Sequence, residues 1–177
     1  MIRRVGLWAG PCAGKTTMAL WIAAELKKAN LSVEYVDEKV KQMAYEGVHP
    51  KGFDQAHLLT CQMKREERYL INGVNHIVTD CPAAMGFAYA VKQNSPGLRG
   101  IRALIEEFEE VYPSLNIFLD REGVPYTERG RYQNYQEALE MDGRIRGLMN
   151  EMYGSDGYAV LPVRDDRRIL DFILSRL

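Results

Sequence analysis

The sequence has few cysteines, no long apolar run and almost no excess of either charge. Three cysteines in 177 residues are too few for a disulfide framework, which favours a reducing, cytoplasmic setting. No segment reaches the roughly 20 apolar residues of a membrane span, so we expect no membrane contact. The net charge of −1 argues against a non-specific polyanion binder. The ordinary composition and the length predict a single domain over residues 1–177.

Lysine is absent after Lys92, and all eleven basic residues beyond it are arginines. Chance or coding bias is one explanation. The other is that some of these arginines bind multi-oxygen anions, whose geometry a planar guanidinium matches better than an ammonium group does.

Short apolar runs alternate with helical patterns along the whole chain. Strands are predicted over 5–8, 32–36, 76–80, 115–119 and 158–161, and the main helices over 15–29, 54–71, 101–111, 134–153 and beyond Asp165. Asn134 with Glu137 resembles a capping box at the start of its helix. This alternation predicts an α/β fold, in which a parallel sheet carries helices on both faces.

The segment that joins the first strand to the first helix is close to the phosphate-loop pattern G-x-x-x-x-G-K-[ST]. Ala9 stands where the pattern has its first glycine, and Gly10 follows at once. Backbone amides curled around an anion at a helix N-terminus bind phosphate groups. The residues predicted to bind nucleotide are Gly10, Pro11, Cys12, Ala13, Gly14, Lys15, Thr16 and Thr17. We expect Lys15 to contact the outer phosphates and the Thr16 hydroxyl to bind magnesium.

Acidic residues follow two of the predicted strands, on the edge where ligands bind in such sheets. Asp80 ends the third strand and is expected to hold Mg²⁺ together with Thr16, although it could instead cap the next helix. Asp37 and Glu38 end the second strand, and one of them is expected to accept a proton from an acceptor hydroxyl. Their alternative role is to complement the positive N-terminus of the following helix.

The polar loop 120–133 carries Arg121, Arg129 and Arg131. Arginines stabilise the charge on a migrating phosphoryl group, and a mobile loop can close as a lid that excludes water. The alternative is a solvated loop with spare charges. Farther along, Asp142 and Arg146 have the i, i+4 spacing of a helix-surface ion pair, which explains Arg146 adequately.

Motifs along nearly the whole chain carry a family resemblance. They are residues 10–17, Asp37-Glu38-Lys39-Val40-Lys41, Gln62, Thr79-Asp80-Cys81-Pro82, Ala88-Tyr89-Ala90, Tyr126, Gly130-Arg131-Tyr132-Gln133, Glu137, Ala138 and Asp142. Together they resemble the small P-loop kinases of the nucleoside and nucleotide kinase type. The likeness is strongest to phage-encoded proteins labelled AAA-family ATPases and extends to the ribosylnicotinamide kinase branch.

The resemblance implies a three-layer P-loop NTPase fold with a five-stranded parallel sheet and an arginine-bearing lid. It implies ATP and Mg²⁺ as cofactors, and the cytoplasm of a host cell as the location if the protein is phage-encoded. Gln62 and Arg65 would face the acceptor pocket. The alternative for them is a polar helix face that continues through residues 64–68.

Three functions are compatible with these features. The first is a kinase that moves the γ-phosphate of ATP to a hydroxyl or phosphate of a nucleoside- or nucleotide-type acceptor. The second is a DNA kinase that acts on a strand end or a hydroxymethylated base, and the third is an ATPase switch without an acceptor. A homodimer is compatible with the sequence, which does not determine the oligomeric state.

Overall fold

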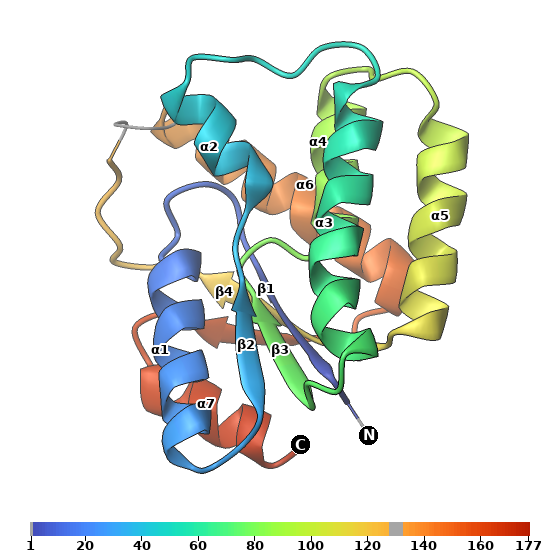
Figure 1. The fold of residues 1–177 in the computed structure, drawn as a ribbon. Coiled ribbons are helices and arrows are strands. Elements are labelled where there is room, and N and C mark those ends of the chain that lie inside the picture. The colour runs from blue at the N-terminus through green and yellow to red at the C-terminus, as the bar shows by residue number, and fades with distance from the viewer. Residues whose placement is uncertain (1, 128–132) are drawn as a thin grey trace.

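The computed structural model describes residues 2–127 and 133–177, and the centre of this part of the chain is a five-stranded parallel sheet (Figure 1). The strands are β1 (Arg4–Trp8), β2 (Val33–Val36), β3 (His76–Thr79), β4 (Ser114–Asp120) and β5 (Ala159–Pro162). Their order across the sheet is β2-β3-β1-β4-β5, and all four neighbouring pairs are parallel. The predicted α/β fold with a five-stranded parallel sheet is therefore confirmed.

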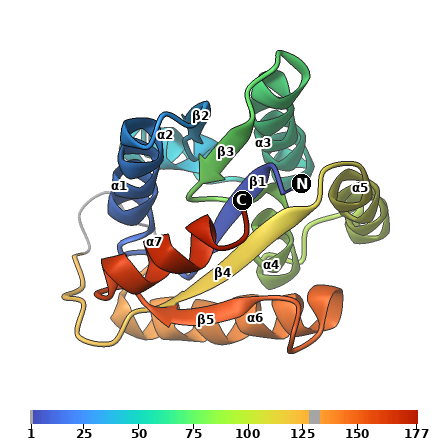
Figure 2. The same ribbon diagram turned by 90° about the horizontal axis from the view of Figure 1, so that it is seen from below.

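Helices cover both faces of this sheet and give the fold its three layers (Figure 2). They are α1 (Lys15–Lys28), α2 (Lys39–Tyr45), α3 (Asp54–Ile71), the 3₁₀ turn η1 (Ala83–Met85), α4 (Gly86–Lys92), α5 (Leu98–Val111), α6 (Tyr135–Tyr153) and α7 (Asp166–Leu174). One apolar core lies between the sheet and helices α1 and α7. A second core lies on the other face of the sheet, where helices α3, α4, α5 and α6 pack. Every residue of β1 is buried, as expected for a central parallel strand covered on both sides.

Local signals fix several helix ends where the sequence predicted them. The Asn134 side chain accepts a hydrogen bond from the Glu137 amide, and Glu137 accepts one from the Asn134 amide, so the capping box is confirmed. The Asp165 carboxylate caps α7 by accepting a bond from the Arg168 amide. The largest error is at α5, which begins at Leu98 rather than at residue 101. Gly97, with φ of +80°, turns the chain directly into this helix.

The charged run 64–68 is not a wholly polar helix face. Glu66 is fully buried, and its Oε2 accepts bonds from Arg4 Nη2 at 2.6 Å and Arg4 Nε at 2.9 Å. Its other oxygen accepts the Ala83 amide at 2.9 Å. The Arg4 guanidinium, itself buried, also pairs with Glu109 at 3.0 Å and lies over the Phe108 ring. Glu66 therefore joins the first residue of β1 to the turn that follows β3.

Within residues 2–127 and 133–177, none of the helices has both the length and the apolar character that crossing a membrane requires.

Candidate functional site

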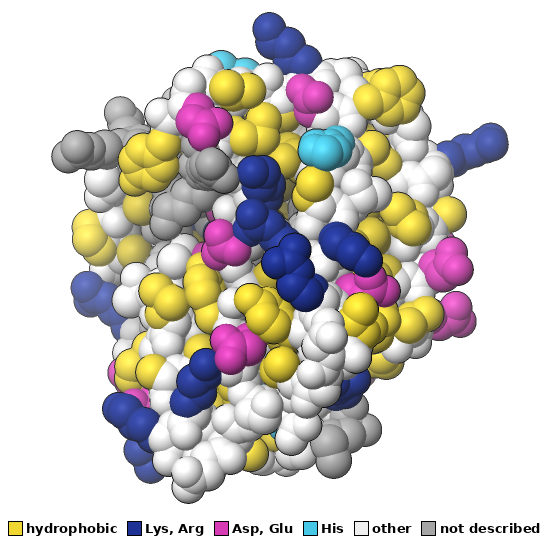
Figure 3. Space-filling model, viewed as in Figure 1, with side chains coloured by type: hydrophobic (Ala, Val, Ile, Leu, Met, Phe, Trp, Pro, Cys, Tyr) yellow, Lys and Arg dark blue, Asp and Glu magenta, His cyan; other side chains and the backbone are white. Residues whose placement is uncertain are grey.

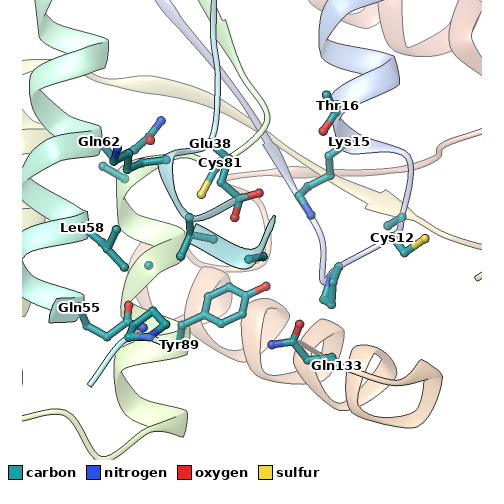
Figure 4. A pocket seen from close by; sticks show the side chains of 18 of the residues that line it. Cys12, Lys15, Thr16, Glu38, Gln55, Leu58, Gln62, Cys81, Tyr89 and Gln133 are labelled. Carbon is teal, nitrogen blue, oxygen red and sulfur yellow. The ribbon is translucent and has the colours of Figure 1, made fainter. Parts of the chain in front are cut away.

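A cleft of about 390 Å³ lies between the phosphate loop and helices α2, α3 and α4 (Figure 4). Residues 11–17 line one side, and Gln55, Leu58 and Gln62 of α3 line the opposite side. Glu38 lies between them, and Figure 4 shows its carboxylate and the Lys15 side chain pointing toward each other. The cleft therefore runs from the phosphate loop to a part lined by Gln55, Leu58, Gln62 and Tyr89, which we call the second pocket.

The phosphate loop connects β1 to α1, as its predicted function requires. Gly14 precedes α1 with φ of +79°, a conformation that favours glycine. It has no side chain that could cap the first amides of the helix, which suits these amides to binding an anion. Lys15 is the first residue of α1, and its Nζ donates to the Gly10 carbonyl at 2.7 Å. Lys15 and the loop amides thus lie together on one side of the cleft.

Gly10, not residue 9, carries the steric requirement of the first glycine in the pattern. Ala9 is fully buried without a clash. A Cβ atom on Gly10 would lie 2.7 Å from the Ala138 carbonyl oxygen and 2.8 Å from Asp142 Oδ1. In this chain the close approach of α6 to the phosphate loop therefore requires glycine at position 10, one residue after the first glycine of the pattern.

Arg121 contacts the phosphate loop from the side away from the cleft. Its Nε lies 2.5 Å from Asp142 Oδ2, and its Nη1 donates to the Pro11 carbonyl at 2.9 Å. The predicted pairing of Asp142 with Arg146 is wrong. Asp142 instead faces the loop and Arg121, and the Arg146 guanidinium lies 5.5 Å from the centre of the Phe118 ring. A tertiary contact has displaced the local helix pair.

The predicted lid, residues 120–133, is described at its two ends. Val124, Pro125 and Gln133 line the cleft, so these ends face the candidate site. The Thr127 amide donates to Cys12 Sγ at 3.2 Å and thereby joins the loop 120–133 to the phosphate loop. Arg129 and Arg131, the other two arginines predicted to act in catalysis, lie outside the described residues.

Asp80 and Thr16 meet at the carboxyl end of β3. The Thr16 hydroxyl donates to Asp80 Oδ2 at 2.5 Å, and the Tyr35 hydroxyl donates to the same oxygen at 3.0 Å. Burial, followed by the nearby Asp80 charge, raises the pKa of Tyr35, so this phenol stays a donor at neutral pH. Asp80 does not cap the next helix turn, because the Ala83 amide donates to Glu66.

The donor set at Asp80 suits magnesium. Asp80 Oδ1 is buried, and no described residue gives it a hydrogen-bond partner. An unsatisfied buried carboxylate oxygen beside a hydroxyl offers the hard oxygen ligands that Mg²⁺ prefers. Among the described residues, no group of three or more acidic, histidine or cysteine side chains could enclose a metal ion. Such an open arrangement matches the way Mg²⁺ binds through one or two carboxylates, waters and substrate phosphates.

The two acids after β2 have different surroundings, which separates the candidates for a base. Glu38 lines the cleft. Asp37 is 67% exposed and forms an ion pair with Arg65 at 2.5 Å. Neither Asp37 nor Arg65 is among the described residues that line the cleft. The structure therefore puts Glu38 at the site and pairs Arg65 with Asp37 outside it.

The second pocket carries amide and apolar side chains. Gln62, predicted to face the acceptor, is buried in the lining, with its Nε2 3.5 Å from Thr79 Oγ1. Gln55 also lines this part of the cleft, although it was not among the residues predicted to face the acceptor. Its Nε2 donates to Gln93 Oε1 at 2.9 Å. The seven-residue spacing of Gln55 and Gln62 places both on one helix face, and this signal was available in the sequence. Tyr89 completes this side of the pocket (Figure 4).

Basic side chains gather near the middle of the face that carries α2 and α3 (Figure 3). Two of the basic residues at α3 are paired with acids: Arg65 with Asp37, and Lys64 with Glu67 at 3.4 Å. Lys64 and Arg65 of α3 therefore each have an acidic partner.

The sheet order and the phosphate loop between β1 and α1 define a three-layer α/β fold of the P-loop type. No family model matches the sequence, and no curated protein matches it. Two NadR structures share the fold. One, in complex with NR, has a TM-score of 0.77 at 15% identity and covers 98% of this chain. The other, in complex with NAD and AMP-PNP, has a TM-score of 0.73 at 14% identity and also covers 98%.

This chain covers 51% and 49% of those two NadR chains, about half of their length. A sugar kinase from a Janibacter species, in an unliganded structure, has a TM-score of 0.58 at 16% identity. It covers 99% of this chain and 94% of its own. At these identities the likeness shows the fold. The comparisons give no support to the likeness with phage-encoded AAA-family ATPases, which stays a prediction from the sequence.

Proposed function

We propose that this protein is a magnesium-dependent kinase that transfers the γ-phosphate of ATP to a hydroxyl of an uncharged, nucleoside-type acceptor. The observation that carries the proposal is the continuity of the cleft, in which the Glu38 carboxylate faces Lys15 between the phosphate loop and the second pocket. The volume of about 390 Å³ lies within the range of small-molecule sites.

In this mechanism, Lys15 and the backbone amides of residues 12–17 bind the β- and γ-phosphates of ATP. Thr16 and Asp80 would hold Mg²⁺, which supplies charge neutralisation on the phosphate oxygens. The acceptor oxygen attacks the γ-phosphorus, the bond to the ADP oxygen breaks, and Glu38 accepts the proton of the acceptor hydroxyl. Glu38 thus has the role that the sequence assigned to either Asp37 or Glu38.

The charge of the second pocket favours an acceptor without a phosphate group. Among the described lining residues outside the phosphate loop, Lys39 is the only basic one, and Glu38 precedes it. Proteins that recognise a phosphate typically hold it with arginine forks or several charged donors. The amides of Gln55 and Gln62 instead suit neutral hydrogen-bonding groups, and Tyr89 offers an aromatic surface for a planar ring.

The first test is an acceptor screen with γ-labelled ATP. We expect label on a neutral nucleoside, with ribosylnicotinamide among those assayed, and a kcat/KM at least about tenfold lower for the corresponding monophosphate. Acceptor binding should depend weakly on salt, because no phosphate contacts are made. Labelling of DNA with steep salt dependence would support the DNA kinase instead. Slow hydrolysis that no acceptor stimulates would support the ATPase switch.

A second test separates the two acids. Glu38→Gln should lower kcat by about 10²- to 10⁴-fold, since the hydroxyl loses its general base, while the Kd for ATP stays near that of the parent. Asp37→Asn should change kcat by less than about threefold, because Asp37 is exposed and paired with Arg65. Steady-state kinetics and calorimetric ATP titrations check both values. A larger loss in Asp37→Asn than in Glu38→Gln would assign the base to Asp37.

A further inference from the structure

We propose that Asp142 and Arg121 form a positioning pair that holds the phosphate loop in its ATP-binding shape through the backbone of Gly10 and Pro11. The inference rests on the proposed function in one respect, namely that ATP is the ligand of this loop. It concerns two residues that act through the loop and not on the substrate.

The pair contacts two consecutive residues of the loop. Asp142 Oδ1 accepts the Gly10 amide at 2.6 Å, and Arg121 Nη1 donates to the Pro11 carbonyl at 2.9 Å. The two side chains also bind each other through two bonds, from Nε to Oδ2 at 2.5 Å and from Nη2 to Oδ1 at 3.0 Å. The Gly10–Pro11 segment is therefore held by two hydrogen bonds, one that its Gly10 amide donates to Asp142 and one that its Pro11 carbonyl accepts from Arg121.

Burial makes these contacts stronger than those of a surface ion pair. The Arg121 side chain is 8% exposed and that of Asp142 is 16% exposed. Paired charges with bidentate geometry and little solvent are stronger than exposed pairs, and they lose more when one partner is removed. Neither residue is among the described residues that line the cleft. An effect on ATP must therefore pass through the loop itself.

Gly10 links the pair to the phosphate side of the loop. Its amide donates to Asp142, and its carbonyl accepts the Lys15 ammonium at 2.7 Å. A Cβ on Gly10 would collide with Asp142 Oδ1 and with the Ala138 carbonyl, so this approach requires glycine. A shift of Gly10 would therefore move the carbonyl oxygen that accepts the hydrogen bond from the Lys15 ammonium.

The chain position of the pair adds a second consequence. Arg121 lies at the start of the loop 120–133, and Asp142 lies in α6, the helix that follows it. Arg121 and Asp142 thus connect the start of this loop and the helix after it to the phosphate loop.

The test combines calorimetric titration of Mg-ATP with hydrogen exchange of the amides in residues 10–17, measured on the full chain without nucleotide. Asp142→Ala should raise the Kd for ATP by about tenfold or more and speed the exchange of the Gly10 amide. Asp142→Asn keeps an acceptor oxygen for Gly10 but loses the charge, and its effect should be smaller. Arg102→Ala is the matched control, because Arg102 pairs with Glu106 and Glu151 away from the loop.

Parent-like Kd and exchange in Asp142→Ala would overturn the proposal. The proposal would also be overturned if Asp142→Ala lowered the thermal stability while hydrogen exchange in residues 10–17 stayed no faster than in Arg102→Ala. That result is what a purely structural role of the pair predicts. If Asp142→Ala fails to fold, Asp142→Asn and Arg121→Lys decide by the same two measurements. If the parent does not bind ATP, the proposed function fails, while the exchange measurement still decides whether the pair holds the loop.

Discussion

Replacing Lys15 with methionine is expected to lower kcat/KM for ATP-dependent phosphotransfer by about 10²- to 10³-fold. The Lys15 ammonium lies in the cleft on the Gly10 carbonyl, and no other described residue of the phosphate loop carries a positive charge. Methionine keeps the long stem that packs at the start of α1 and removes the charge that we propose binds the outer phosphates. Steady-state kinetics at varied ATP concentrations measures the loss.

Lys28→Met is the matched control, because Lys28 is the last residue of the same helix and forms a surface pair with Glu25. It should retain parent kinetics. Circular dichroism should show both variants folded, since neither substitution shortens the side chain greatly. A Lys15→Met protein that still phosphorylates at the parent rate would exclude this cleft as the site of the reaction.

Replacing Glu66 with alanine is expected to lower the free energy of unfolding by about 3–5 kcal/mol. The substitution leaves the Arg4 guanidinium, 1% exposed, without the carboxylate that accepts two of its hydrogen bonds. It also removes the acceptor of the Ala83 amide. Urea denaturation followed by circular dichroism measures the change.

Glu67→Ala controls for the loss of a neighbouring carboxylate, whose contact with Lys64 is long and exposed. It should cost less than about 1 kcal/mol. The double variant Arg4→Met with Glu66→Leu should recover part of the stability, since it also removes the buried Arg4 charge, which Glu66→Ala leaves with Glu109 as its remaining carboxylate partner. Equal destabilisation by Glu66→Ala and Glu67→Ala would show that the buried pair does not stabilise the fold.

Most of the architecture could be predicted from the sequence because its signals are local. Apolar runs marked the strands, and the capping box at Asn134 and Glu137 marked the start of α6. The phosphate loop was also readable, since its chemistry lies in eight consecutive residues whose place between strand and helix follows from the same patterns.

The contacts that brace the site could not be read because their partners are distant in the chain. Asp142 lies 132 residues from Gly10, and Glu66 lies 62 residues from Arg4. Local rules gave two wrong predictions. The i, i+4 spacing favoured Arg146 as the partner of Asp142. The charged run 64–68 predicted a polar helix face, although Glu66 within it is buried. Side chains of consecutive residues at a strand end point in opposite directions, so only one of Asp37 and Glu38 was expected to face the site. The sequence did not show which of the two it would be.

The buried contact between Glu66 and Ala83 has a consequence for how the molecule opens. Through Glu66, the segment that begins with Asp80 is joined to the central strand and to α3, where local unfolding costs the most. The loop 120–133 carries no such buried ion pair within its described residues beyond Arg121. We infer that the corner formed by Thr16 and Asp80 belongs to the last cooperative unit to unfold. A protein without nucleotide would then keep this corner formed.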